Sequence, residues 1–339
     1  MILTLLAATI PMVPPTGSSP VPLPVIPVAQ EVPPTAALGS ALDYSVLARP
    51  SAIDPANEAL IGGRKVAFQP NAGYASVFRH QIGRDGSVVL SRSSDGNYIT
   101  HRWSIWKAGQ ERPVEVLHQA AAIDQYLDAR NFAGSFYGDE NDTGSATPPA
   151  DESWAYVVQD GRARIVGRGT VAAWSPGGLI ATTVQVDADG KPAGYELAVG
   201  EHAWVIDGTR TYDIGHARYV GRLLDGALVF SDDGKSAGLH IWRNGRLAPW
   251  ASLPPGWTAV ATDRQDRVLA QVEGPGAWTL GFLRGTSFLP LRLDHPIILN
   301  GVGELNASEV RRIFPDGRIV LDTHLGTHAA PFTVVLTAR

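Results

Sequence analysis

The chain has 339 residues, a formal net charge of −5 and no cysteine. It is long enough to bury a large core, and the lack of cysteine excludes disulfides and thiolate metal sites. The slightly acidic balance, with no basic block, argues against a nucleic-acid partner.

The N-terminus begins with a short apolar run and continues into a proline-rich stretch. Residues 2–13 are too few to span a bilayer, but they match the length of a signal-peptide core. No basic residue precedes the run and no clean cleavage site follows it, so a disordered apolar tail is the alternative. We expect an exported protein, periplasmic or extracellular, without a transmembrane span. Residues 1–43 are then a signal-like segment and a proline-rich spacer, and residues 44–339 form a single domain.

A turn followed by a short β-branched strand recurs six times along the rest of the chain. The steps between the first turn residues are 43, 49, 48, 41 and 50, and these residues are Asp85, Asp128, Gly177, Asp225, Asp266 and Asp316. This is the period of a four-stranded propeller blade. Asp-Gly and Asn-Gly pairs between apolar runs also predict tight hairpins, because these residues tolerate positive φ.

A second mark, an aromatic residue on the third strand of each unit, accompanies the turns in constant order. Its members, which we expect at equivalent positions in the core, are Trp106, Tyr156, Trp204, Trp242, Phe282 and Phe332. The segment 118–130 favours a helix by composition, but it fits the repeat as a strand. The sequence therefore predicts an all-β fold, a six-bladed β-propeller of four-stranded antiparallel blades.

The last unit reaches the end of the chain without a fourth strand. We expect an N-terminal strand, within residues 60–69, to complete it and to close the ring.

The repeats resemble the bacterial HAF-type repeat, in which a His-Ala-Phe-x-Trp strand follows an Ala-x-x-Ile-Asn strand and a glycine turn. The matching residues are His202, Ala203 and Trp204 in "EHAWVIDG", His240 and Trp242 in "LHIWRNG", and Ala121, Ile123 and Asp124 in "AAAIDQ". The resemblance implies a propeller, usually in an exported protein, and it implies no catalytic residue. We expect His202 and His240 to be structural.

One end of the propeller carries connections that vary in length, and variable loops on a rigid scaffold are where ligands usually bind. Tyr98 and Tyr137 belong to two such connections. Three histidines each follow the fourth strand of a unit: His118, His216 and His295. Arg218 lies two residues after His216. The histidines are candidates for proton transfer or metal binding near the axis, and all four residues are candidates for ligand binding. The alternative is that each histidine caps a local turn.

The acidic loop "DENDTG" partly matches a calcium loop. Asp139, Asn141 and Thr143 alternate before Gly144, but position twelve of such a loop, Ala150, is not a glutamate. A calcium site and a solvated acidic loop are therefore both compatible with the sequence.

No nucleophile triad, P-loop or dinucleotide fingerprint is present. We expect a non-catalytic propeller that binds a glycan or an envelope protein through its loop-rich face. The alternatives are a propeller enzyme, a polysaccharide lyase or hydrolase with an axial active site, and a purely structural repeat.

Overall fold

The structure, a computed structural model, describes most of the chain. The described residues are 25–28, 33–50, 58–61, 64–67, 76–93, 101–114, 122–137, 153–193, 197–232, 238–274, 277–294, 307–313, 317–323 and 332–339. All regular structure in these ranges is β-strand, as the sequence predicts. None of them forms a helix long and apolar enough to cross a bilayer.

Most strands form four-stranded antiparallel meanders whose members follow one another in sequence. The first consists of β6 (Ser76–Ile82), β7 (Val88–Ser93), β8 (His101–Lys107) and β9 (Gln110–Pro113). The second consists of β10 (Ala122–Asp128), β11 (Asn131–Tyr137), β12 (Ser153–Gln159) and β13 (Arg162–Arg168).

The next two meanders share one long strand. β14 (Thr170–Trp174), β15 (Leu179–Val186) and β16 (Gly200–Asp207) pair with the first half of β17 (Arg210–Arg222). The second half of β17 pairs with β18 (Leu228–Asp232), which continues into β19 (Gly238–Arg243) and β20 (Arg246–Ser252). A further meander follows, of β21 (Thr258–Thr262), β22 (Arg267–Gly274), β23 (Ala277–Arg284) and β24 (Ser287–Leu293).

The C-terminal strands are completed by a strand from the other end of the chain. β25 (Ala307–Ile313), β26 (Ile319–Thr323) and β27 (Phe332–Ala338) form a meander. The outer neighbour of β27 is β3 (Leu42–Pro50), antiparallel, with Ala338 opposite Tyr44. The predicted partner within 60–69 is wrong, because β5 (Arg64–Ala67) pairs instead with β4 (Glu58–Ile61) in a separate hairpin.

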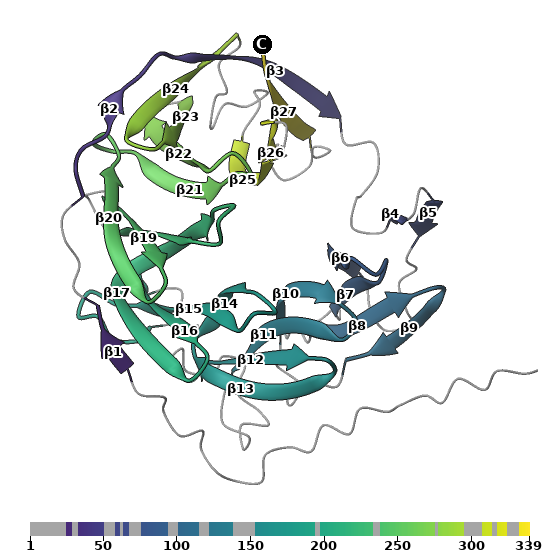
Figure 1. The fold of residues 1–339 in the computed structure, drawn as a ribbon. Coiled ribbons are helices and arrows are strands. Elements are labelled where there is room, and N and C mark those ends of the chain that lie inside the picture. Colours follow the sequence, from purple (N-terminus) through teal and green to yellow (C-terminus); the bar gives the residue numbers. More distant parts are fainter. Residues whose placement is uncertain are drawn as a thin grey trace, which may run out of the picture.

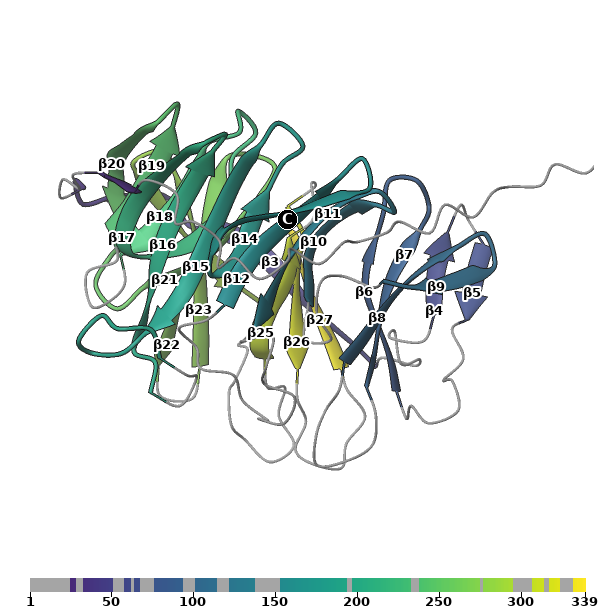
Figure 2. The same ribbon diagram turned by 90° about the horizontal axis from the view of Figure 1, so that it is seen from below.

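The meanders stand around a common centre like the blades of a β-propeller. In Figure 1 the first strands, such as β10, β14 and β21, face inward, and the fourth strands, such as β13, β20 and β24, lie outside. From the side, the strands run roughly along one axis (Figure 2). Several hairpins turn through two residues with positive φ, as at Asp160-Gly161 and Asn244-Gly245, which confirms the predicted turn chemistry.

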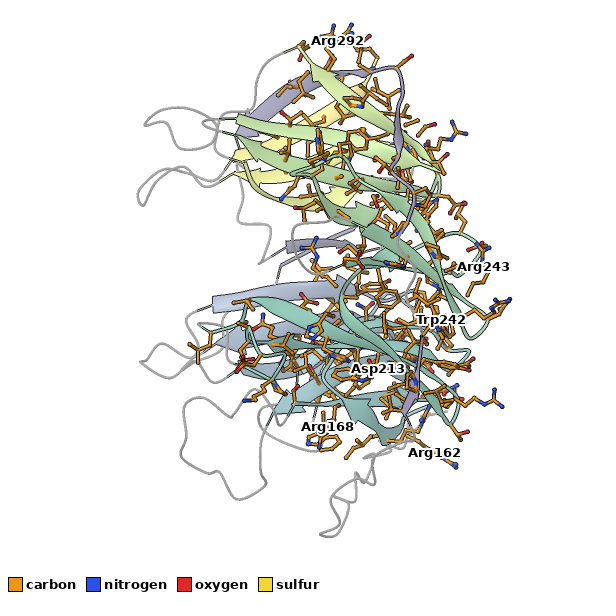
Figure 3. The ribbon with its side chains drawn as sticks, turned by 90° about the vertical axis from the view of Figure 1, so that its left-hand side faces the viewer. Arg162, Arg168, Asp213, Trp242, Arg243 and Arg292 are labelled. Atoms are coloured by element: carbon orange, nitrogen blue, oxygen red, sulfur yellow. The ribbon has the colours of Figure 1, made fainter. Side chains whose placement is uncertain are left out.

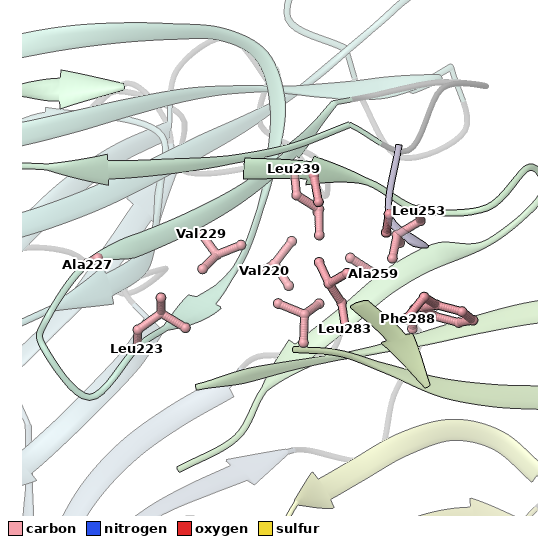
Figure 4. Close-up of a cluster of buried hydrophobic side chains, with 13 residues drawn as sticks. Val220, Leu223, Ala227, Val229, Leu239, Leu253, Ala259, Leu283 and Phe288 are labelled. Carbon is pink, nitrogen blue, oxygen red and sulfur yellow. The ribbon is translucent and has the colours of Figure 1, made fainter. Parts of the chain in front are cut away.

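The core lies between neighbouring meanders rather than within one. The cluster in Figure 4 joins Val229 and Leu239 of one meander to Leu283 and Phe288 of the next. Four other clusters of the same kind occur in the described residues. A meander that stands between two others thus buries both of its faces because its neighbours cover them.

The predicted equivalence of the six aromatic residues is wrong. The six residues occupy four different positions in their strands. The next-to-last position holds Trp106 or Trp242, and the fourth position from the end holds Tyr156 or Trp204. Phe282 is third from the end, which places it on the opposite face, and Phe332 is the first residue of β27. Tyr156, Trp242 and Phe282 are all buried, although Phe282 lies on the opposite face, because neighbouring meanders cover both faces of these third strands.

The described residues 25–28 and 33–50 follow the outside of the fold (Figure 1). β1 (Val25–Pro27) adds to β17, Thr35 bridges to Ser252, and β2 (Ala37–Leu38) adds to β24, all in parallel orientation. β3 begins on β24 and continues along β27. We call the described residues 25–28 and 33–50 the N-terminal belt; the predicted domain boundary after residue 43 falls inside β3.

Candidate functional site

The structure describes only part of the predicted site. His118, His295, Tyr98 and the predicted calcium ligands Asp139, Asn141 and Thr143 lie outside the described residues. Tyr137 is described as the last residue of β11. His216 and Arg218 are described and lie on β17. Within the described ranges, no group of three histidine or carboxylate side chains is arranged to hold a metal ion.

β17 positions His216 at the junction between two meanders. Gly215 has a φ of 86°, a conformation that glycine adopts without strain, and a register shift between Ala203 and Trp204 lies opposite this point. The strand can therefore leave one meander and enter the next. His216 is exposed and faces His202 of β16, with ring centroids 5.5 Å apart.

His202 is held by a carboxylate. Its Nε2 lies 2.6 Å from Asp213 Oδ1, and the same oxygen accepts the backbone N–H of Gly215 at 2.9 Å. The ring also stacks on the indole of Trp204 at 4.4 Å, with 27° between the planes. The His202 and Asp213 side chains are 20% and 31% exposed, so solvent reaches both. We call His202, Trp204, Asp213 and His216 the His–Asp cluster. Asp213, labelled in Figure 3, lies on the half of β17 that pairs with the belt strand β1.

This arrangement is suited to proton transfer. When Asp213 accepts the Nε2–H of His202, the tautomer is fixed and Nδ1 is left as a base. His216 supplies a second imidazole at the same place. The cluster was missed at the sequence level because its carboxylate lies on the neighbouring strand, eleven residues along the chain, and only strand pairing brings it to His202.

Arg218 serves a different contact. Its guanidinium Nη2 donates to the carbonyl oxygen of Ala259, which ties β17 to the first strand of the next meander. The contact holds the second half of β17 against β21, and both are the innermost strands of their meanders.

The second histidine of the repeat motif has a different environment. His240 Nε2 lies 2.9 Å from Asp232 Oδ1, but the side chain is buried, and its Nδ1 has no hydrogen-bond partner among the residues that the structure describes. Counted from the hairpin turns, His240 corresponds to Trp204 and not to His202. The similar letters "HAW" and "HIW" are therefore two residues out of structural register.

A partly buried carboxylate, that of Asp124, lies on the innermost strand β10. Asp124 accepts a hydrogen bond from Ser135 Oγ at 2.7 Å and one from the backbone N–H of Val171 at 3.3 Å. Burial raises the pKa of Asp124, and these hydrogen bonds only partly offset the effect. Because Val171 belongs to the next meander, Asp124 links two meanders.

Comparison with known proteins shows likeness of fold only. No family model matches the sequence, and no curated protein matches it. A structure from a study of two prolyl endopeptidases is similar with a TM-score of 0.52 at 10% identity, over 82% of this chain and 45% of that one. The β-propeller domain of the Trilobed protease from Pyrococcus furiosus gives a TM-score of 0.47 at 11% identity, over 74% of this chain and 78% of that one.

At such low identity the first likeness concerns the fold. This chain spans less than half the length of the prolyl endopeptidase structure. The likeness to that structure agrees with the radial arrangement of four-stranded meanders described above.

Proposed function

We propose that the chain is an exported six-bladed β-propeller whose ring is completed by β3. Five meanders are built from consecutive strands, and the sixth takes its fourth strand from the N-terminal belt. The apolar run at residues 2–13 supports export, as a signal-peptide core.

We further propose that this propeller is an enzyme acting on a polysaccharide, as a lyase or hydrolase, and that its acid–base site is the His–Asp cluster. The observation that carries the proposal is the 2.6 Å contact between His202 Nε2 and Asp213 Oδ1, with a second imidazole 5.5 Å away. General acid–base catalysis needs two such groups within reach of one substrate. Asp213 lies opposite Pro27 of the belt strand β1, so the site proposed here is at an outer strand of the fold and not on its axis (Figure 1).

Each member of the cluster has a role in this proposal. His202 takes a proton from the attacking water in a hydrolase, or from the sugar carbon next to a carboxylate in a lyase. Asp213 orients His202 and stabilises its charged form. His216 returns a proton to the leaving oxygen. The indole of Trp204 stacks on the His202 ring and holds it in place.

The test is turnover of a panel of uronic-acid polysaccharides and neutral glucans, followed by reducing ends and by the ultraviolet absorbance of unsaturated products. His202→Ala and His216→Ala should each lower kcat by about 100-fold or more, the usual range for a lost acid or base. Asp207→Asn is the control, because Asp207 is an exposed residue of the same strand outside the cluster. Full activity in His202→Ala, with the fold retained, would contradict the proposal.

A second candidate is binding of a glycan or an envelope protein without catalysis. The stacking of His202 on a partly exposed indole favours it, because aromatic platforms of this kind also hold sugars in binding modules. In that case Trp204→Ala abolishes binding to an immobilised glycan array, and His202→Gln leaves binding in place with no turnover of any polysaccharide.

A further inference from the structure

Outer sheet edges of this protein accept additional strands. The N-terminal belt pairs in parallel with β17, bridges to β20 and pairs with β24. Belt residues such as Pro27 and Pro34 lack a backbone N–H, so the belt itself ends the sheet rather than offering a full edge to another strand.

The edge of β13 is not covered in this way. In the described part of the chain, β13 is the edge strand of its meander and pairs only with β12. The Asp160-Gly161 turn has positive φ at both residues, so Gln159 and Arg162 form the hydrogen-bonded pair beside the turn. Ala163 and Ile165 then direct their backbone N–H and C=O groups outward, because hydrogen-bonded and non-hydrogen-bonded pairs alternate.

The side chains of this edge are strongly basic. Arg162, Arg164 and Arg168 are all exposed, and Arg168 lies over the ring of Trp154 at 5.6 Å. The side chains of Arg162 and Arg164 form no ion pair with any residue that the structure describes. Figure 3 shows Arg162 and Arg168 at the outer surface. Arg162 and Arg164 are two residues apart, which is the repeat of side chains on one face of a strand.

The edge of β9, by comparison, is poorly suited to strand addition. It has four residues, contains Glu111 and ends at Pro113. A short edge strand that ends in proline offers few backbone groups.

We propose that the outer edge of β13 binds an extended acidic segment of another polypeptide by strand addition. Backbone hydrogen bonds to Ala163 and Ile165 supply affinity, and acidic side chains at every second position pair with Arg162 and Arg164. This surface is independent of the His–Asp cluster, so it stands whether or not the protein is an enzyme.

The experiment measures binding of a fluorescent peptide to the full chain by anisotropy. The probe alternates glutamate with threonine over seven residues between glycines, and a second peptide carries lysine in place of glutamate. The glutamate peptide should bind and the lysine peptide should not. Arg162→Glu/Arg164→Glu should weaken binding by about tenfold or more, because both charge-assisted contacts become repulsive.

The matched control is Arg210→Glu. Arg210 follows the hairpin turn of its meander as Arg162 does, but its edge is already occupied by β1. This variant should bind the glutamate peptide like the unchanged protein. Equal loss in Arg210→Glu would show non-specific attraction and overturn the proposal.

Hydrogen exchange gives a second readout that does not depend on charge. Peptide addition should slow amide exchange at Ala163 and Ile165, whose N–H groups point outward, and Ala163→Pro should abolish binding because it removes an outward donor. If these amides are already protected in the free protein, another part of the chain occupies the edge and the proposal fails. It also fails if the glutamate peptide does not bind.

Discussion

At the scale of single residues, charge and burial decide what a carboxylate does. Asp124 and Asp85 both belong to the repeat, yet their environments are opposite. Burial raises the pKa of Asp124. Burial acts in the same direction on Asp85, but hydrogen bonds from Lys107 and Ser87 and the charge of Lys107 outweigh it and lower the pKa of Asp85 to about 2. The two residues should therefore affect stability against pH with opposite signs.

Asp124→Asn should increase the free energy of unfolding at neutral pH. The folded protein holds the Asp124 proton more tightly than the unfolded chain does, so the side chain opposes folding more as pH rises through the raised pKa. The asparagine oxygen can still accept the Ser135 hydrogen bond. Urea unfolding should show the gain at about pH 7 and little difference at about pH 3, below the ordinary pKa of aspartate.

Asp85→Asn is the control with the opposite sign. A lowered pKa contributes stability that is present above the ordinary aspartate pKa and is lost as pH falls towards about 2. This variant should be less stable than the unchanged protein at about pH 7, with the difference shrinking in acid. A loss of stability at neutral pH in both variants would contradict the sign assigned to Asp124.

At the scale of elements, the sequence predicts the hairpin turns better than it predicts where the aromatic residues lie along the strands. Asp160-Gly161 and Asn244-Gly245 form tight turns because their backbone needs positive φ, a local property of those residues. The aromatic marks were less reliable. Phe282 and Trp242 lie on opposite faces of their strands relative to the turns, and alternation along a single strand does not reveal which neighbour covers which face.

Gly134 of β11 shows how closely strands approach within a meander. A Cβ on Gly134 would overlap the carbonyl oxygen of Ala122 and lie 2.6 Å from Tyr156 Oη. The Tyr156 hydroxyl uses this space to donate to the Ala122 carbonyl oxygen at 2.8 Å. Gly134→Ala should therefore lower the free energy of unfolding by about 1–3 kcal/mol, as overpacking does.

Gly177→Ala is the matched change in open space. The nearest atom to a Cβ there is Ser175 Oγ at 3.9 Å, and Gly177 is not among the glycines with positive φ. The free energy of unfolding of Gly177→Ala should stay within about 0.5 kcal/mol of that of the unchanged protein. Urea titration measures it for both glycine variants. Equal effects at Gly134 and Gly177 would mean that the close approach does not limit the packing of this meander.

At the scale of the whole molecule, the two ends of the chain meet in one sheet. β3 pairs with β27 over seven residue pairs, from Phe332 opposite Pro50 to Ala338 opposite Tyr44. Tyr44 is buried and its hydroxyl donates to the carbonyl oxygen of Gly317. The cluster around Tyr44, Phe282 and Leu336 thus joins residues from both ends of the chain.

A rearranged chain tests this pairing. Because the N–H of Arg339 donates to the carbonyl oxygen of Asp43, a two-residue Asn-Gly turn can join residue 339 to residue 43 as a hairpin. Residues 51–339 followed by Asn-Gly and residues 43–50 should fold with a cooperative thermal transition. Residues 51–339 alone should lack this transition, since Leu336 and Phe282 lose part of their cover. Equal transitions in both chains would show that β3 is dispensable.

The sequence by itself determined the all-β class, the recurring four-strand unit and the chemistry of its turns, because hairpin signals and strand alternation are local. Only the tertiary structure decided that β3, and not residues 60–69, lies against β27, and that Asp213 reaches His202. Several N-terminal segments have the composition of an edge strand. Which one is used depends on the register and packing of strands that are distant along the chain, and periodicity does not record these contacts.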